Sequence, residues 1–116
     1  MKIRGLMMAV SLVALAATGC TSAVDETVLP MPGAATPPHR HDCDEVILCQ
    51  AGVGELHVDG QVHRFGADCT LVLPRDCPHQ IFNVGAIPME ILGVFGATPV
   101  ATWLPNGEAL ELPWRT

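Results

Sequence analysis

The sequence has almost no lysine and few basic residues of any kind. Six lysines and arginines stand against 12 acidic residues, which gives a formal net charge of -6. Lys2 and Arg4 lie at the extreme N-terminus, so residues 20–116 contain no lysine and only four arginines. Nucleic-acid-binding domains need a basic surface that follows the phosphate backbone. The composition therefore excludes nucleic acid as the expected partner.

The sequence also lacks apolar residues repeated at helical spacing over any useful length. Instead, 11 glycines and 10 prolines are spread through 116 residues, with short apolar runs between them. This mixture is typical of short strands joined by tight turns, and the length fits one domain. The sequence thus predicts an all-β domain over residues 27–116, folded as a small antiparallel sandwich or barrel.

The expected strands are separated by recognisable turns. The clearest hairpin runs from Glu55 to Phe65, where Asp59-Gly60 predicts a two-residue type I′ turn. Asn106-Gly107 predicts a second turn of this type between two later strands. Strands outside the first hairpin are expected at residues 27–29, 45–49, 69–73, 79–84, 89–95, 98–104 and 109–112. The 45–49 strand is apolar on both faces, so we expect it inside a sheet.

The N-terminus has the pattern of a bacterial export signal. Lys2 and Arg4 precede an apolar run over residues 6–17, which is too short to be a comfortable membrane-spanning helix. We expect residues 1–19 to be an export signal and residues 20–26 to be a tether. The protein is then expected in the periplasm or cell envelope.

The end of this signal indicates how the protein could be held at a membrane. Ala17-Thr18-Gly19-Cys20 resembles a bacterial lipobox, which implies lipidation of Cys20 and contact with the membrane only through that lipid anchor. The alternative is ordinary signal-peptidase cleavage nearby, which would leave Cys20 removed or free.

Four residues have the spacing and chemistry of metal ligands. His39 and His41 are two positions apart, so on an extended strand both imidazoles point to the same face. Glu45 keeps that parity, and His79 begins a later apolar stretch. Three histidines and one carboxylate can hold a divalent ion and leave coordination positions open. The alternative is that these are polar residues on a solvated sheet face.

These residues lie within a pattern that resembles the two signatures of the cupin family. The first signature is matched by Gly33, His39, His41, Glu45 and Gly52, and the second by Pro74, His79 and Asn83. Two glycines of the second signature are replaced, one by Asp68 and one by Asp76. Both departures lie at turns, so they concern the local backbone conformation more than metal binding.

The resemblance implies a jelly-roll barrel with one divalent metal ion held by the three histidines and Glu45. It also implies that Asn83 hydrogen-bonds a turn or the backbone. The ligand types do not distinguish zinc, manganese, copper, nickel and iron, although an oxidising compartment disfavours ferrous iron. His57 and His63 lie on the Asp59-Gly60 hairpin, which in the cupin pattern extends away from the metal.

Four cysteines follow Cys20, and an even number in an exported chain suggests disulfides. Sequence alone allows three full connectivities. The topology implied by the resemblance places His41 opposite His79, so that Cys43 faces Cys77 and Cys49 lies near Cys69. The predicted bridges are therefore Cys43–Cys77 and Cys49–Cys69. The alternatives are buried thiols or a cysteine that binds the metal.

Two classes of function fit this sequence. The first is a metal-dependent oxygenase, isomerase or lyase that acts on a small molecule. The second is a non-catalytic module that binds a metal or a small ligand, because neither signature supplies a further carboxylate or a lysine as a dedicated acid or base. A homodimer is a further expectation, since a chain of this size has little surface to spare for covering its own sheet edges.

Overall fold

The structure is a computed structural model and describes residues 9–14 and 23–111. All regular elements in this part of the chain are strands. They are β1 (Ala9–Ala14), β2 (Ala23–Leu29), β3 (Arg40–His41), β4 (Glu45–Ala51), β5 (Val53–Val58), β6 (Gln61–Gly66), β7 (Thr70–Leu73), β8 (His79–Asn83), β9 (Met89–Phe95) and β10 (Thr102–Trp103). Within the described ranges, no helix is long and apolar enough to span a membrane.

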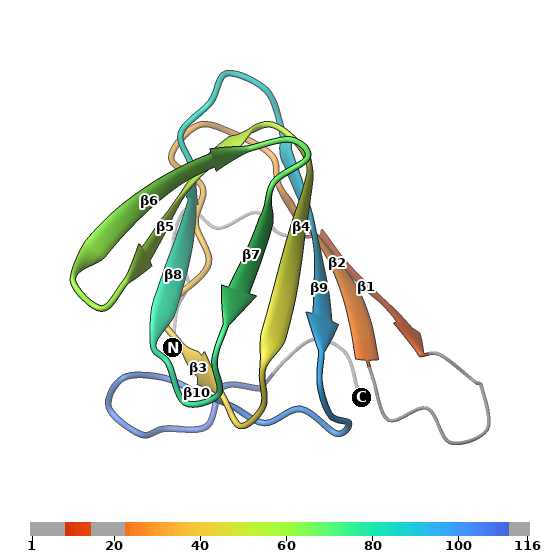
Figure 1. The fold of residues 1–116 in the computed structure, drawn as a ribbon, viewed down its shortest axis with the longest axis vertical. Helices are drawn as coiled ribbons and strands as arrows, with labels where there is room; N and C mark the ends of the chain where they lie inside the picture. The colour runs from red at the N-terminus through yellow and green to blue at the C-terminus, as the bar shows by residue number, and fades with distance from the viewer. Residues whose placement is uncertain (1–8, 15–22, 112–116) are drawn as a thin grey trace.

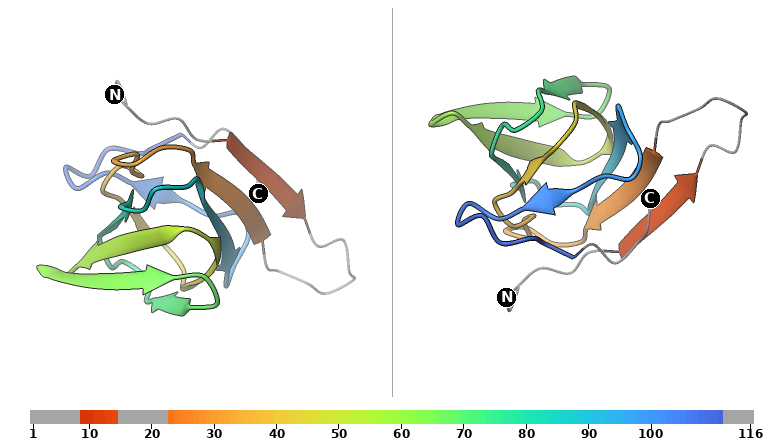
Figure 2. Two further views of the ribbon diagram at one scale, coloured as in Figure 1. Left: turned by 90° about the horizontal axis from the view of Figure 1, so that it is seen from above. Right: turned by 90° about the horizontal axis from the view of Figure 1, so that it is seen from below.

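The strands form three antiparallel sheets. The largest has the order β1-β2-β9-β4-β7, the second has the order β6-β5-β8, and β10 pairs with β3 in the third. The two larger sheets curve towards each other, with β3 and β10 at one end (Figures 1 and 2). This all-β arrangement confirms the predicted jelly-roll barrel. Strand β4 lies between β9 and β7, as its two apolar faces predicted.

The hydrophobic core fills the space between the two larger sheets. Side chains alternate between the two faces of a strand, and the inner faces of β4, β8 and β9 are buried. Leu29, Ile47 and Met89 contribute from one sheet, and Leu56 and Ile81 from the other. A second apolar cluster, formed by Cys43 and Phe95 with Ala97 and Val100 packed against it, lies next to His41, whose ring centroid is 4.9 Å from that of Phe95.

The side chain of Asn83 hydrogen-bonds three backbone groups next to the hydrophobic core. Its side chain is fully buried and donates hydrogen bonds to the carbonyl oxygens of Leu29 and Ile87, at 2.9 and 3.0 Å. Its Oδ1 accepts a hydrogen bond from the Gly85 N–H, at 3.0 Å. The backbone hydrogen-bonding role implied by the cupin resemblance is therefore confirmed.

One of the two predicted type I′ turns forms. Asp59 and Gly60 both have positive φ, at 51° and 72°, as a type I′ turn requires. At the second turn only Gly107 has positive φ, and its N–H bonds the carbonyl of Leu104. The type I′ prediction for Asn106-Gly107 is wrong, because the turn runs from Leu104 to Gly107 and Asn106 does not have positive φ.

Aspartates replace the two signature glycines without changing the backbone that the glycines would adopt. Asp68 has φ of 68° and Asp76 has φ of 60°, both in the left-handed region that favours glycine. Aspartate enters this region more readily than most residues because its short side chain can hydrogen-bond locally. The two departures from the cupin pattern therefore preserve its turns.

The N-terminal part of the chain contains more strand than the sequence predicted. β2 begins at Ala23 instead of residue 27, so residues 23–26 of the expected tether lie in the sheet. β1 lies within the expected export signal and pairs with β2, where Ala9 is opposite Val28. Cys20 lies outside the described residues, as does the rest of the expected signal.

Candidate metal centre

Three of the predicted ligands meet at the end of the barrel beside β3 and β10. His39 forms a backbone bridge with His79 at the start of β8, and His41 follows in β3. Each histidine can offer one ring nitrogen, and these three nitrogens lie within 4.8 Å of one another. His41 and His79 are buried, whereas His39 is half-buried. The same-face prediction for His39 and His41 is thus confirmed.

Hydrogen bonds hold each of the three imidazoles through its Nδ1. That nitrogen lies 2.6 Å from the Pro37 carbonyl in His39 and 3.0 Å from the Cys77 carbonyl in His79. In His41 it lies 2.8 Å from Oγ1 of Thr102, on β10. A carbonyl can only accept, so Nδ1 of His39 and of His79 carries the proton and Nε2 keeps its lone pair. Metal-binding histidines are commonly oriented in this way.

Glu45 completes the predicted group from the start of β4. Its Oε1 is 3.6 Å from Nε2 of His41 and 3.6 Å from Nε2 of His79. This oxygen is buried and has no hydrogen-bond partner. Buried polar atoms are normally satisfied, and an exception often marks a functional site. A cation between Oε1 and the imidazole nitrogens would satisfy it, so the residues present fit a divalent metal.

Burial keeps the imidazoles and Glu45 uncharged in the metal-free protein. Desolvation, with a contribution from the neighbouring histidines, lowers the pKa of His39 to about 3 and that of His41 to about 4. Desolvation also lowers the pKa of His79. Desolvation, followed by the charge of Asp25, raises the pKa of Glu45 to about 8. Near pH 7 the close contacts of Glu45 with the imidazoles are therefore contacts between neutral groups.

Asp25 is a buried carboxyl beside this group that the sequence analysis did not find. It lies on β2 and is only 5% exposed. Desolvation raises its pKa to about 6, although a hydrogen bond with the Gly93 backbone opposes the shift. The residues around Asp25 follow the expected export signal and were assigned to a tether. Only the pairing of β2 with β9 brings its carboxyl to Glu45.

A cleft lined mainly by apolar residues opens on the side of the barrel. Its volume is about 390 Å³, and it opens between the β5–β6 hairpin and β7. Two of its lining residues, Val58 and Leu73, are cross-strand neighbours of His79 and Glu45. None of the four candidate ligands lines this cleft, whereas His79 lines a second cavity.

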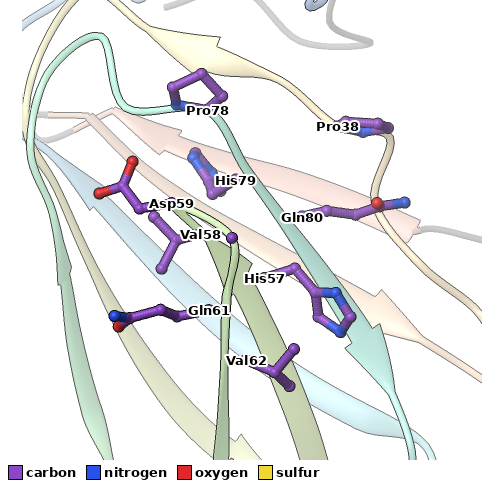
Figure 3. A pocket seen from close by; sticks show the side chains of 10 residues that line it. Pro38, His57, Val58, Asp59, Gln61, Val62, Pro78, His79 and Gln80 are labelled. Carbon is purple, nitrogen blue, oxygen red and sulfur yellow. The ribbon is translucent and has the colours of Figure 1, made fainter.

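A second cavity, of about 460 Å³, lies at the tip of the same hairpin. Figure 3 shows Pro38 and Pro78 along one side of it, with Asp59 and Gln61 of the hairpin opposite. His57 lines this cavity, and its ring packs against Phe82 at 4.5 Å between centroids.

His57 and His63 are not part of the ligand group, as predicted. The Nε2 atom of His57 is 3.3 Å from Oε1 of Glu55. His63 is exposed on β6 and lines the apolar cleft. The three clustered histidines within the described residues are His39, His41 and His79.

The predicted disulfides do not form in the structure. Cys43, Cys49, Cys69 and Cys77 are all free thiols. The first pairing assumed that His41 is opposite His79, but His39 is opposite His79, so Cys43 and Cys77 are out of register. The backbones of Cys49 and Cys69 do meet, with 3.1 Å between N and O. However, Cys49 is buried in the core while Cys69 is exposed.

Comparison with known proteins places this geometry in a family context. Residues 27–95 match the family profile described as Cupin domain. Auxin-binding protein 1 of Arabidopsis thaliana is 29% identical over 82 residues, which cover 63% of this chain and 41% of the relative. Auxin-binding protein T92 of Nicotiana tabacum is 27% identical over 84 residues, which cover 63% of this chain and 45% of the relative. The chain thus spans less than half the length of these curated relatives.

Solved structures share the fold at low sequence identity. The DMSP lyase DddQ of Ruegeria pomeroyi has a TM-score of 0.66 at 24% identity, covering 76% of this chain and 45% of that one. An oxalate decarboxylase of Bacillus subtilis has a TM-score of 0.74 at 21% identity, and the match covers 85% of this chain and 28% of that one. A cupin-like protein of Thermotoga maritima has a TM-score of 0.68 at 18% identity, covering 78% and 71%. The Cupin domain profile matches more than half of this chain, so the chain belongs to the cupin family.

Proposed function

We propose that this cupin binds one divalent metal ion through His39, His41, His79 and Glu45 and acts on a small molecule that reaches the ion through the cavity lined by His79. The observation that carries the proposal is the buried Oε1 of Glu45, which has no hydrogen-bond partner and lies 3.6 Å from two imidazole nitrogens. The orientation of the imidazoles through their Nδ1 atoms supports the same role.

The chemistry proposed is that of a metal-dependent oxygenase, isomerase or lyase. A bound metal ion supplies a Lewis acid that polarises a substrate oxygen. Val58 lines the same cavity as His79 and would exclude water from the space beside that ligand. A solved structure with this fold is named a DMSP lyase, and others are named oxalate decarboxylase and oxalate oxidase. Those names make small organic acids and their derivatives the first compounds to test.

A second candidate is a non-catalytic module that binds a small ligand. The curated relatives are named auxin-binding proteins, which favours binding without turnover. The predominantly apolar lining of the cleft fits that role as well. Incubating the metal-loaded protein with a panel of small organic acids, followed by NMR, separates the two candidates. Product that His79→Ala fails to form supports an enzyme, whereas ligand shifts without product support a binding module.

The metal site can be tested directly by elemental analysis. Full-length protein is loaded with Mn²⁺, the ion named in the work on Bacillus subtilis oxalate decarboxylase, and parallel samples are loaded with zinc, copper, nickel or iron. We expect about one ion per chain in the parent protein and a sub-stoichiometric amount in His79→Ala. His57→Ala is the matched control because His57 lies outside the ligand group. Equal metal in the parent and in His79→Ala would remove His79 from the site.

We further propose that the protein is exported and anchored by lipid at Cys20. The support is the sequence pattern over residues 1–20. Cleavage before Cys20 would remove β1 and free the edge of β2, where a second copy could pair to form a homodimer. Mass spectrometry of the mature N-terminus tests the anchor, and light scattering of the same material tests the dimer. An unmodified terminus away from Cys20 would refute lipidation.

A further inference from the structure

Asp25 and Glu45 come together inside the barrel although they lie on strands that do not pair with each other. β9 runs between β2 and β4, and Asp25 is directly opposite Gly93 of β9. Glu45 begins β4 and pairs with Phe95, two residues further along β9. Asp25 and Glu45 are both buried, at 5% and 7% exposure. Their carboxyl groups therefore share the interior space above one strand.

Gly93 provides the room that the two carboxyl groups occupy. A Cβ atom at this position would lie 2.7 Å from Oε2 of Glu45 and 2.8 Å from Oδ1 of Asp25. Both distances are shorter than real Cβ contacts, so the two oxygens fill the volume that a side chain at residue 93 would need. Oε2 of Glu45 and Oδ1 of Asp25 therefore both border the space over Gly93.

The two oxygens of Glu45 thus have different surroundings. Oε1 lies beside the imidazole nitrogens of His41 and His79, while Oε2 lies beside Asp25. Two buried carboxylates that face each other repel strongly unless a proton or a cation lies between them. A metal ion on the Oε1 side favours the negative charge on Glu45, so the proton belongs on Asp25.

We propose that Asp25 is a positioning residue that donates a hydrogen bond to Oε2 of Glu45 and so presents Oε1 alone to the metal. The inference rests on the proposed function, because it assigns Asp25 a role at that metal site. Hydrogen bonds to metal-binding carboxylates fix their orientation, and their loss typically lowers metal affinity 10- to 100-fold. Without Asp25, Glu45 would be free to turn and bind through both oxygens or neither.

The test compares two substitutions of similar size in the full-length protein. Asn in Asp25→Asn can donate an N–H to Oε2 and cannot titrate, so we expect Mn²⁺ affinity within about threefold of the parent. Leu in Asp25→Leu fills the space without a donor, so we expect affinity at least about tenfold weaker. Thr27→Val is the matched control, because Thr27 is a buried polar residue on the same strand. Affinity is measured by competition with a chelator.

Infrared spectroscopy of the metal-loaded proteins provides a readout that a general loss of stability would not move. The carboxylate stretches of Glu45 should indicate binding through one oxygen in the parent and in Asp25→Asn, and should change in Asp25→Leu. If Asp25→Leu does not fold, Asp25→Ser replaces it, since serine is too short to reach Glu45.

The outcomes separate this inference from the proposed function. Parent-like affinity in Asp25→Leu, or equally weak affinity in Asp25→Asn and Asp25→Leu, overturns the role of Asp25. If the parent itself binds no metal, the proposed function fails first. If the parent binds metal that His79→Ala loses but Asp25→Leu keeps, the metal site stands and only the positioning role is lost.

Discussion

Replacing Glu45 with glutamine is expected to stabilise the metal-free protein while weakening metal binding. Burial and the charge of Asp25 raise the pKa of Glu45 from 4.5 to about 8. Between these values the folded state holds a proton that the unfolded state has released, so stability falls as pH rises. At pH 7, roughly 2.5 units above the unfolded pKa, the linkage costs about 3 kcal/mol. Glutamine has a similar volume and no charge, so it removes this cost.

Urea unfolding of both proteins in the presence of EDTA measures the effect. The glutamine variant should be about 3 kcal/mol more stable than the parent at pH 7 and about 1 kcal/mol more stable at pH 5. The difference shrinks because pH 5 lies only about 0.5 units above the pKa of the unfolded carboxyl, so releasing the proton on unfolding contributes little free energy there. Metal affinity should fall, since an amide replaces a charged ligand. Equal stability at pH 7, or a difference independent of pH, would refute the reasoning.

Three other results are expected from the same structure. Metal binding should transfer the proton of Glu45 to Asp25 without releasing it to solvent, so apparent affinity should be nearly independent of pH between about 6 and 8; a tenfold rise per pH unit in a chelator-competition profile contradicts this. Asn83→Leu removes three hydrogen bonds and should lower the free energy of unfolding by roughly 3 kcal/mol, measured with urea, at about 1 kcal/mol each. Asp68→Gly should raise the melting temperature by relieving up to about 1 kcal/mol of left-handed backbone strain, whereas Asp68→Ala should not.

The ligand set could be predicted because it depends mainly on local strand geometry. His39 and His41 face the same way on any extended chain, and Glu45 keeps their parity. His79 had to come from a distant strand, and only the cupin resemblance supplied that pairing. The structure brings these side chains together around the unpartnered Oε1 of Glu45.

The disulfide prediction failed because it required long-range register and side-chain direction. A pairing that is two residues away from the assumed one separates Cys43 from Cys77. The backbones of Cys49 and Cys69 are adjacent as expected, yet one side chain enters the core and the other leaves it. Placing two cysteines side by side on neighbouring strands is therefore not enough to predict a disulfide. The two Cα–Cβ bonds must also point towards each other.

Asp25 shows a different limit of sequence reasoning. No apolar alternation marks it, and its relation to Glu45 depends on a glycine in a third strand. What marks the site physically is that two carboxyls and three histidines lie together in the protein interior. Each of them would cost free energy if it were ionised there. Folding alone avoids that cost by keeping the imidazoles and Glu45 neutral near pH 7. A divalent cation offsets it instead, because it stabilises the ionised form of Glu45 and the lone pairs of the imidazoles together. The end of the barrel where these buried polar groups gather is thus the end suited to hold a metal.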